Sequence, residues 1–235
     1  MKKYTLAAAL FAGFFAITTS ACNHSDASSS TEKSENAAVS SDSQPQATKI
    51  TSPEQLTELA KQTSKSAEKV YTIQMTKMGD LATIFPTVEL QVLKPDAKSR
   101  MVSVTGYQME GAESVIYKAK GQRSIVAVVS EKGQSEITLG KASQDDYGNN
   151  WRPAALTGTI QDDVVDSQQA LWQYADHLDS TYCSSCHAKI APDHFTVNAW
   201  GPVAKSMGAR TNMSKQDLQI LTKYFESNAK DAVKK

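Results

Sequence analysis

The hydrophobic pattern changes its period twice along this chain. Apolar positions are spaced for a helix just after residue 52, alternate in short runs from about residue 70 to residue 129, and return to helical spacing near Asp166. The pattern therefore predicts one helix, then a block of short strands, then a group of helices. This order indicates an α+β fold in which an antiparallel β domain precedes an all-α domain.

The first helix has a clear start signal. Ser52 can cap it, Pro53 occupies the first helical position, and Gln55 stands three residues after the cap. We expect a helix from Pro53 to about Lys69.

The strand block consists of short runs rich in β-branched residues, separated by Gly, Pro, Asp or Lys. These runs are Val70–Met75, Leu81–Phe85, Val88–Leu93, Met101–Tyr107, Ser114–Tyr117 and Ile125–Val129. They indicate a small antiparallel barrel or sandwich. Their order, with "MGDLATIFPTVELQVLK", "MVSVTGYQ" and "SVIYKAKGQRSIVAVV", resembles a bacterial SH3-like domain. Since no catalytic cluster lies here, we interpret this domain as a scaffold, with a docking surface as the alternative.

The C-terminal helices surround one short motif. Apolar residues from Ala170 to Tyr182 share a helical face, and a last helix is predicted from Lys215 to about Ala229. Another helix is expected around Trp200 to Lys205.

The N-terminus has the pattern of an export signal. Lys2 and Lys3 precede an apolar stretch from Leu6 to Ile17, so residues 1–21 are predicted to be a signal peptide. The segment that ends in Cys22 resembles the lipobox of bacterial lipoproteins, which implies that Cys22 is lipidated. The alternative is ordinary cleavage near Ala21, which leaves Cys22 as a thiol. Asn23 favours the outer over the inner membrane under the enterobacterial sorting rule.

Residues 22–51 are dominated by small and polar side chains. Such a composition cannot bury enough apolar surface to form a core. We expect a lipidated, disordered tether with a reach of about 30 Å. The predicted domains are then residues 52–160, with the first helix and the SH3-like part, and residues 161–235.

Charge and hydropathy exclude two classes of protein. The 235 residues carry 25 Lys and Arg against 25 Asp and Glu, so the net charge is zero and the electrostatic footprint of nucleic-acid binding is missing. No apolar run is long enough to span a bilayer in the mature protein. Neither nucleic acid nor a membrane-spanning role is expected.

The most specific motif is Cys183-Ser184-Ser185-Cys186-His187, a CxxCH sequence. Cysteines at i and i+3 lie on one side of a helical turn, so both sulfurs can form thioethers with one haem while the next histidine ligates the iron. The motif predicts one covalent haem c, attached at Cys183 and Cys186, with His187 as the proximal ligand. A zinc half-site would need a second Cys or His pair, a thioredoxin-like pair would begin a helix after a strand, and a disulfide loop is the third alternative.

The sixth iron ligand has several candidates. Met207 stands twenty residues after His187, a separation that lets the chain return over the opposite haem face. We expect Met207 to be this ligand. Met213, His194 and an open or water-occupied position are the alternatives.

Three segments carry a wider resemblance. The stretch "CSSCHAKIAPDHFTVNAWGPVAKSMGARTNMSKQDLQILTKYFESNAKD", with "VTGYQMEG" and "QQALWQYADHL" before it, resembles the C-terminal region of pentahaem c-type cytochromes that serve periplasmic trimethylamine N-oxide reductases and related molybdenum enzymes. In that family this module passes electrons to the terminal reductase. The resemblance implies haem attachment at Cys183 and Cys186, and Met207 matches a methionine that follows the family's Asn-x-Trp element.

The expected function is electron transfer without catalysis. A single CxxCH implies that the family's tetrahaem, quinol-oxidising domain is missing, so the partners would be a donor cytochrome or quinol dehydrogenase and a periplasmic terminal reductase. A lipid anchor at Cys22 would hold the protein at the envelope, facing the periplasm. The alternatives are a haem-based sensor of gases or small ligands, and an envelope adaptor that uses the SH3-like domain.

Overall fold

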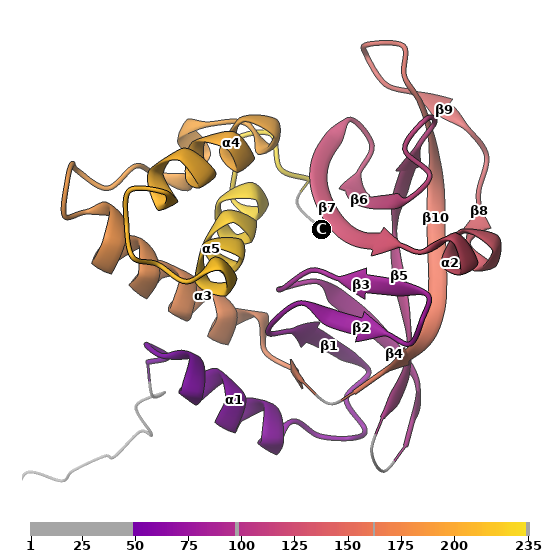
Figure 1. The fold of residues 1–235 in the computed structure, drawn as a ribbon, viewed down its shortest axis with the longest axis horizontal. Coiled ribbons are helices and arrows are strands. Elements are labelled where there is room, and N and C mark those ends of the chain that lie inside the picture. Colours follow the sequence, from indigo (N-terminus) through magenta and orange to yellow (C-terminus); the bar gives the residue numbers. More distant parts are fainter. Residues whose placement is uncertain (1–48, 97–98, 162, 234–235) are drawn as a thin grey trace, which may run out of the picture. The chain divides into compact units, whose positions relative to one another are not determined.

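A curled antiparallel sheet lies beside a group of helices in the computed structural model, which describes residues 49–96, 99–161 and 163–233 (Figure 1). This arrangement confirms the α+β class. The SH3-like identity of the sheet, the all-α haem domain and the predicted domain boundary stay predictions. The lipidation candidate, Cys22, lies outside the described residues, as do the signal peptide and nearly all of the tether.

The first helix, α1, spans Pro53–Gln62, and its predicted cap is confirmed. The backbone N–H of Gln55 donates to Ser52 Oγ at 3.4 Å, and the N–H of Ser52 donates to Gln55 Oε1 at 3.1 Å. The predicted end near Lys69 is wrong, since the helix stops at Gln62. Arg100, from the sheet, donates to the backbone oxygens of Thr63, Ser64 and Lys65 at 2.9–3.4 Å and stabilises the turn that replaces the last helical turns.

The sheet follows the order β11-β1-β4-β5-β6-β7-β3-β2, and β10 pairs with β5 on its other side. Its longer strands are β4 (Glu89–Pro95), β5 (Arg100–Met109), β6 (Val115–Ala119), β7 (Gln122–Val129) and β10 (Asn150–Ile160). The shorter ones are β1 (Lys69–Thr72), β2 (Thr76–Met78), β3 (Ala82–Ile84), β8 (Thr138–Leu139), β9 (Ser143–Gln144) and β11 (Val164–Val165). Each predicted run contains or overlaps one of these strands.

The longest strand, β10, was not predicted from the sequence. It pairs with β5 over its whole length, from Trp151 opposite Met109 to Ile160 opposite Arg100. Pro153 and Gly158 interrupt its sequence, and both residue types weaken a strand signal. The short helix α2 (Glu131–Glu136) was missed as well. Pairing with β5 therefore holds this segment in a strand, although its local preference for strand is weak.

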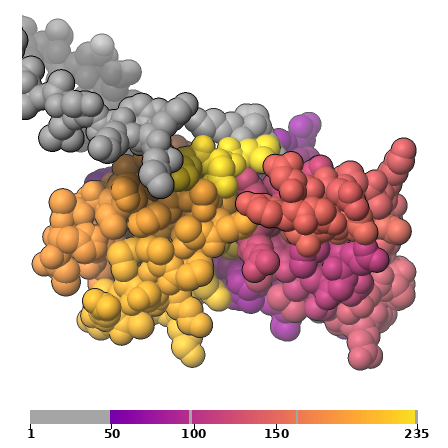
Figure 2. Space-filling model, turned by 90° about the horizontal axis from the view of Figure 1, so that it is seen from above, coloured from indigo at the N-terminus to yellow at the C-terminus, as the bar shows by residue number. Residues whose placement is uncertain are grey.

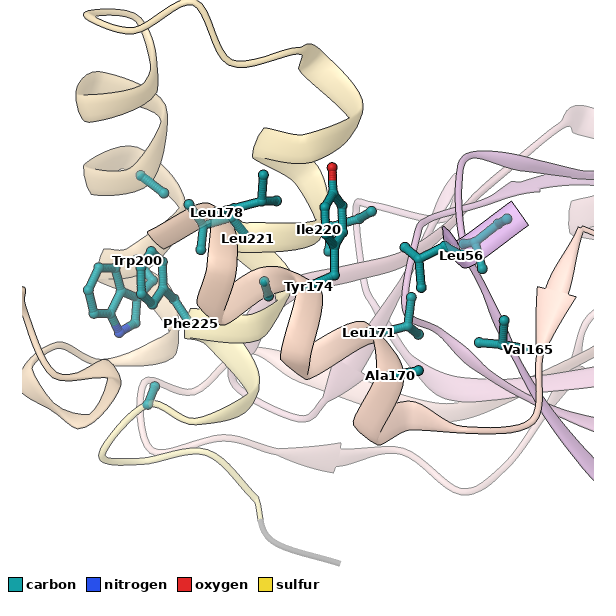
Figure 3. Close-up of a cluster of buried hydrophobic side chains, with 14 of the residues drawn as sticks. Leu56, Val165, Ala170, Leu171, Tyr174, Leu178, Trp200, Ile220, Leu221 and Phe225 are labelled. Carbon is teal, nitrogen blue, oxygen red and sulfur yellow. The ribbon is translucent and has the colours of Figure 1, made fainter. Parts of the chain in front are cut away.

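Two separate cores lie under these elements. The sheet core is aliphatic and includes Leu90, Val102, Val104 and Leu156, all fully buried. The helical core combines α1 with the C-terminal helices, because Leu56 of α1 packs into the same cluster as Leu171 and Val165 (Figure 3). The first helix thus shares its buried face with the C-terminal helices.

The C-terminal helices are α3 (Gln168–Leu178), α4 (Val197–Gly208) and α5 (Lys215–Ser227), with a π-helical turn η1 (Asp179–Cys183) and a 3-10 turn η2 (Pro192–His194). They confirm the predicted helices near Trp200 and from Lys215 onward. Within the described ranges no helix has both the length and the apolar character required to cross a membrane.

The sheet and the helices are joined by a buried polar cluster. Lys223 of α5 lies 2.7 Å from Glu226 Oε2, and it also donates to Ser124 Oγ of β7 at 3.1 Å. The Ser124 hydroxyl donates to the same Glu226 oxygen at 2.5 Å. Figure 2 shows the helical part in orange and yellow meeting the magenta and red sheet. Three hydrogen-bonded groups therefore fix the position of α5 on the sheet.

Candidate haem site

The CxxCH motif begins where α3 ends. Leu178 closes the α-helix and the π-turn η1 follows at once, so Cys183 is the last helical residue. Cys183 is half-buried, whereas Cys186 and His187 are exposed in the turn behind it. The π-helical geometry is rare and is associated with functional sites. The motif is therefore presented at a helix end, with both thiols free.

The His187 ring contacts the backbone of the next residue. Its Nδ1 atom lies 2.7 Å from the backbone carbonyl oxygen of Ala188. A carbonyl oxygen only accepts, so this contact favours the tautomer in which Nδ1 carries the proton and donates. In that tautomer the lone pair is on Nε2, which is the arrangement of a histidine that ligates a metal through Nε2.

A cavity lies directly beside the motif. The motif residues form part of its wall, and α4, α5 and the loop between them form the rest. Its lining consists of Tyr182, Cys183, Cys186, His187, Ala204, Met207, Gly208, Arg210, Thr211, Met213, Leu218, Leu221 and Phe225. Most of these side chains are apolar, as expected for a site that excludes water from a flat hydrophobic cofactor.

The donor atoms around this cavity fit a covalently attached haem. Two thiols and one imidazole come from five consecutive residues, and thioether sulfurs of methionine are present on other parts of the wall. Gly208 allows the close approach of α4 to α5, since a Cβ atom there would lie 2.6 Å from the Leu218 side chain. The groups that a haem c needs are therefore gathered at one cavity.

The candidate sixth ligands are not equally placed. Met207, near the end of α4, and Met213, just before α5, both line the cavity. His194 does not line it; its exposed ring contacts Phe195 with 4.6 Å between ring centroids. Ser214 caps α5 by accepting from the N–H of Asp217 at 3.1 Å. The choice of Met207 over Met213 stays a prediction.

Cys183 does not have the features of a redox-active thiol. Burial, with the nearby Asp179 carboxylate as a second cause, raises the pKa of the Cys183 thiol to about 11. Catalytic and redox-active cysteines have lowered pKa values instead, because the thiolate is the reactive form. This environment disfavours the thioredoxin-like alternative.

A charged cluster holds the chain on both sides of the motif. The Lys189 amino group lies 2.6 Å from Asp176 Oδ1 and 3.2 Å from Asp179 Oδ2, and donates to Ser180 Oγ at 3.2 Å. Asp179 is 1% exposed, and burial raises the pKa of its carboxyl group. The cluster ties the residues after His187 to the end of α3. Nothing in the sequence spacing had indicated it.

Aromatic rings pack behind the cavity wall. Phe225, which lines the cavity, stacks on Trp200 with ring centroids 4.1 Å apart and an interplanar angle of 11° (Figure 3). The Trp200 indole donates to the backbone oxygen of Pro192 at 2.6 Å. Trp200 is fully buried and is part of the helical core.

Comparisons with known proteins identify the family. A family model described as the TorC third cytochrome c domain matches residues 58–165, a range that ends before Cys183. The cytochrome c-type protein TorY of Escherichia coli O157:H7 is 47% identical over 167 residues, which are 71% of this chain and 46% of that protein. The chain belongs with the C-terminal monohaem region of the TorC-like cytochromes.

Two further relatives support this assignment. TorY of Haemophilus influenzae is 33% identical over 158 residues, covering 66% of this chain and 43% of that protein. TorC of Escherichia coli K12 is 28% identical over 191 residues, covering 77% of this chain and 49% of the relative. The chain thus spans about half the length of these relatives. No solved structure matches it significantly. Membership of a c-type cytochrome family implies covalently bound haem c.

Proposed function

We propose that this TorC-like chain is a monohaem electron carrier that accepts electrons from a donor cytochrome or quinol dehydrogenase and delivers them to a periplasmic terminal reductase. The acceptor class is the molybdenum N-oxide or S-oxide reductases, as the resemblance to the pentahaem family implies. One observation carries the proposal: Cys183, Cys186 and His187 share a single apolar cavity with Met207 and Met213. The protein itself performs no catalysis in this proposal.

Each part of the cavity has a role in holding the cofactor. Cys183 and Cys186 would attach it, His187 Nε2 would bind the iron, and a methionine sulfur would supply the second iron ligand. Haem c supplies a reversible one-electron couple, and a Met/His ligand pair raises its reduction potential. The apolar wall from Leu221 and Phe225 keeps water away and lowers the local dielectric.

The first experiment is an optical spectrum of the purified, reduced protein with and without carbon monoxide. We expect a low-spin spectrum that the gas does not change, because both axial positions are filled. Met207→Ala should open the site to carbon monoxide, while the matched variant Met213→Ala should leave the spectrum unaltered. A gas-induced shift in the unmodified protein would contradict the carrier function and favour the ligand-sensor alternative.

We further propose that Cys22 is lipidated and holds the protein at the envelope, facing the periplasm, with the outer membrane favoured. This part rests on the N-terminal sequence alone. The test is Cys22→Ala in whole cells. The variant should move from the membrane fraction to the periplasmic fraction and lose the mass of the lipid at its N-terminus, whereas retention in the membrane fraction would refute the anchor.

A further inference from the structure

A second, larger groove lies between the sheet and the helices. Its volume is about 1100 Å³, and it is bounded by residues of β4, β5, β6, β7 and β10 on the sheet side and of α3 and α5 on the helical side. This volume exceeds the range of typical small-molecule pockets. Lys223, which pairs with the buried Glu226, is part of its lining. None of the residues that line the haem cavity lines this groove.

The charge of this groove is predominantly positive. Among the described residues that line it, Lys69, Lys118, Lys120 and Lys223 are basic and Glu89 is acidic. Lys69 lies 3.4 Å from Glu89, and Lys223 lies 2.7 Å from Glu226. Lys118 donates to the Ser227 hydroxyl at 2.9 Å and Lys120 to the Gln144 carbonyl oxygen at 2.8 Å. Both side chains are exposed at the groove.

The arrangement of its side chains resembles that of a protein interface. Tyr107 and Trp172 are half-buried in the lining, whereas Lys118 and Lys120 are exposed. Protein interfaces commonly combine aromatic residues at their centre with a polar rim. Opposite charge across such a surface steers the partner and fixes its orientation. A wide groove with these features fits an acidic protein surface better than a small anion.

Aromatic contacts connect this groove to the haem cavity. Trp172, in the groove lining, contacts Tyr224 edge to face at 5.6 Å between centroids. Tyr224 contacts Phe225 at 5.7 Å, and Phe225 lines the haem cavity. Electron transfer rates fall steeply with distance and are highest through tightly packed atoms. Three packed rings thus provide a short, dense route from the cavity to the groove.

We propose that this groove is the docking site for an acidic surface of the redox partner, and that Trp172 couples the docked partner to the haem. The proposal rests on the carrier function and adds the place of contact and the chemistry of the partner. The electron moves singly: the reduced protein loses one electron, the partner gains it, and no proton is transferred.

Binding is tested first, because it does not depend on electron transfer. The probe is a fluorescein-labelled peptide of ten glutamates, followed by fluorescence anisotropy at low salt with the intact haem protein. We expect salt-sensitive binding that Lys118→Glu/Lys120→Glu weakens at least about tenfold. The matched control, Lys77→Glu/Lys94→Glu, makes the same change in net charge on exposed lysines outside the groove lining and should bind like the unmodified protein.

Two binding results would overturn the proposal. One is equal weakening by both charge reversals, which would assign binding to overall charge. The other is an unmodified protein that does not bind the peptide at all. Neither result would alter the carbon monoxide experiment, so failure of the docking site can be distinguished from failure of the carrier function.

The coupling role of Trp172 is tested by stopped-flow oxidation of the reduced protein with hexacyanoferrate(III), an anionic one-electron acceptor. Trp172→Leu should slow the reaction severalfold with an unchanged haem spectrum, and Trp172→Phe, which keeps a ring, should restore most of the rate. Tyr147→Leu serves as the control, since Tyr147 is 87% exposed and outside the groove lining. An unchanged rate in Trp172→Leu would assign electron exit to another part of the surface and refute the proposal.

Discussion

The sheet and the helical part of this protein have cores of different kinds. The buried cluster of the sheet is built from Val, Leu, Ile, Ala and Met side chains and contains no aromatic ring. The helical core contains Tyr174, Trp200 and Phe225, and the candidate haem cavity opens beside it. The sheet can therefore close its core with its own side chains, whereas the helical part has a cavity that the covalent cofactor is expected to fill. Stability and chemistry are assigned to different regions.

The strongest test of this difference is removal of both proposed haem attachments. Cys183→Ala/Cys186→Ala should abolish covalent haem, because no other pair of thiols lines the cavity among the described residues. Amide hydrogen exchange should show lost protection in α4 and α5, with protection in β5 and β10 largely retained. An equal loss in both regions would show that the two cores are one cooperative unit.

The reverse test weakens the sheet core alone. Leu90→Ala removes a fully buried side chain and should lower the free energy of unfolding by about 2 to 5 kcal/mol, with an unchanged haem spectrum. The matched variant Leu93→Ala, at a position that is 56% exposed, should change it by less than about 0.5 kcal/mol. Denaturant unfolding of both variants measures the difference. A haem spectrum that changes in Leu90→Ala would contradict the separation of the two regions.

A third test concerns the junction between the regions. Lys223→Met leaves the Glu226 carboxylate buried without its cation and should cost about 1 to 3 kcal/mol of unfolding free energy. Lys223→Met/Glu226→Leu removes both charges and should recover most of that loss, since buried pairs can be replaced by apolar residues. Chemical denaturation measures the free energy of unfolding of both variants. If the double variant is no more stable than the single variant, the charged pair itself stabilises the junction.

The smallest effect concerns the loop between β9 and β10. The Asp145 carboxyl group accepts hydrogen bonds from the Asn149 side chain, from the Trp151 indole and from backbone N–H groups. These bonds lower its pKa to about 2, and the Asn149 side chain contributes most. The unfolded chain titrates near 3.8, so the carboxylate stabilises the fold above about pH 4. This contribution should be lost as the pH falls to about 2. Asp145→Asn should make the thermal midpoint depend less on pH in this range. If the thermal midpoints of the variant and of the unmodified protein change equally with pH, the assignment is contradicted.

The elements predicted best from the sequence were those with local signals. Ser52 and Gln55 form a capping box within four residues, Pro53 follows the cap, and the structure shows both features. The CxxCH motif is equally local, so the gathering of Cys183, Cys186 and His187 at one cavity follows from adjacency in the chain. Short-range spacing carries this information because the relevant atoms are held together by the backbone itself.

The elements that were missed depend on distant partners. β10 is a strand because β5 pairs with it along its length, despite Pro153 and Gly158. The early end of α1 is stabilised by Arg100, almost forty residues further along the chain. The same is true of three other features, because each joins residues that are not related by helical or strand spacing. They are the Lys189 cluster, the groove beside Lys120 and the ring contacts of Trp172.

The sequence by itself determined the α+β class, the position of the CxxCH motif and the two helices that follow it, because periodicity, caps and motif spacing act within a few residues. Only the tertiary structure decided which methionines line the cavity with His187, which core α1 joins, and how α5 is fixed on the sheet through Ser124. The physical reason is that packing and pairing between distant segments are set by shape and burial in the folded chain, and these have no counterpart in local spacing.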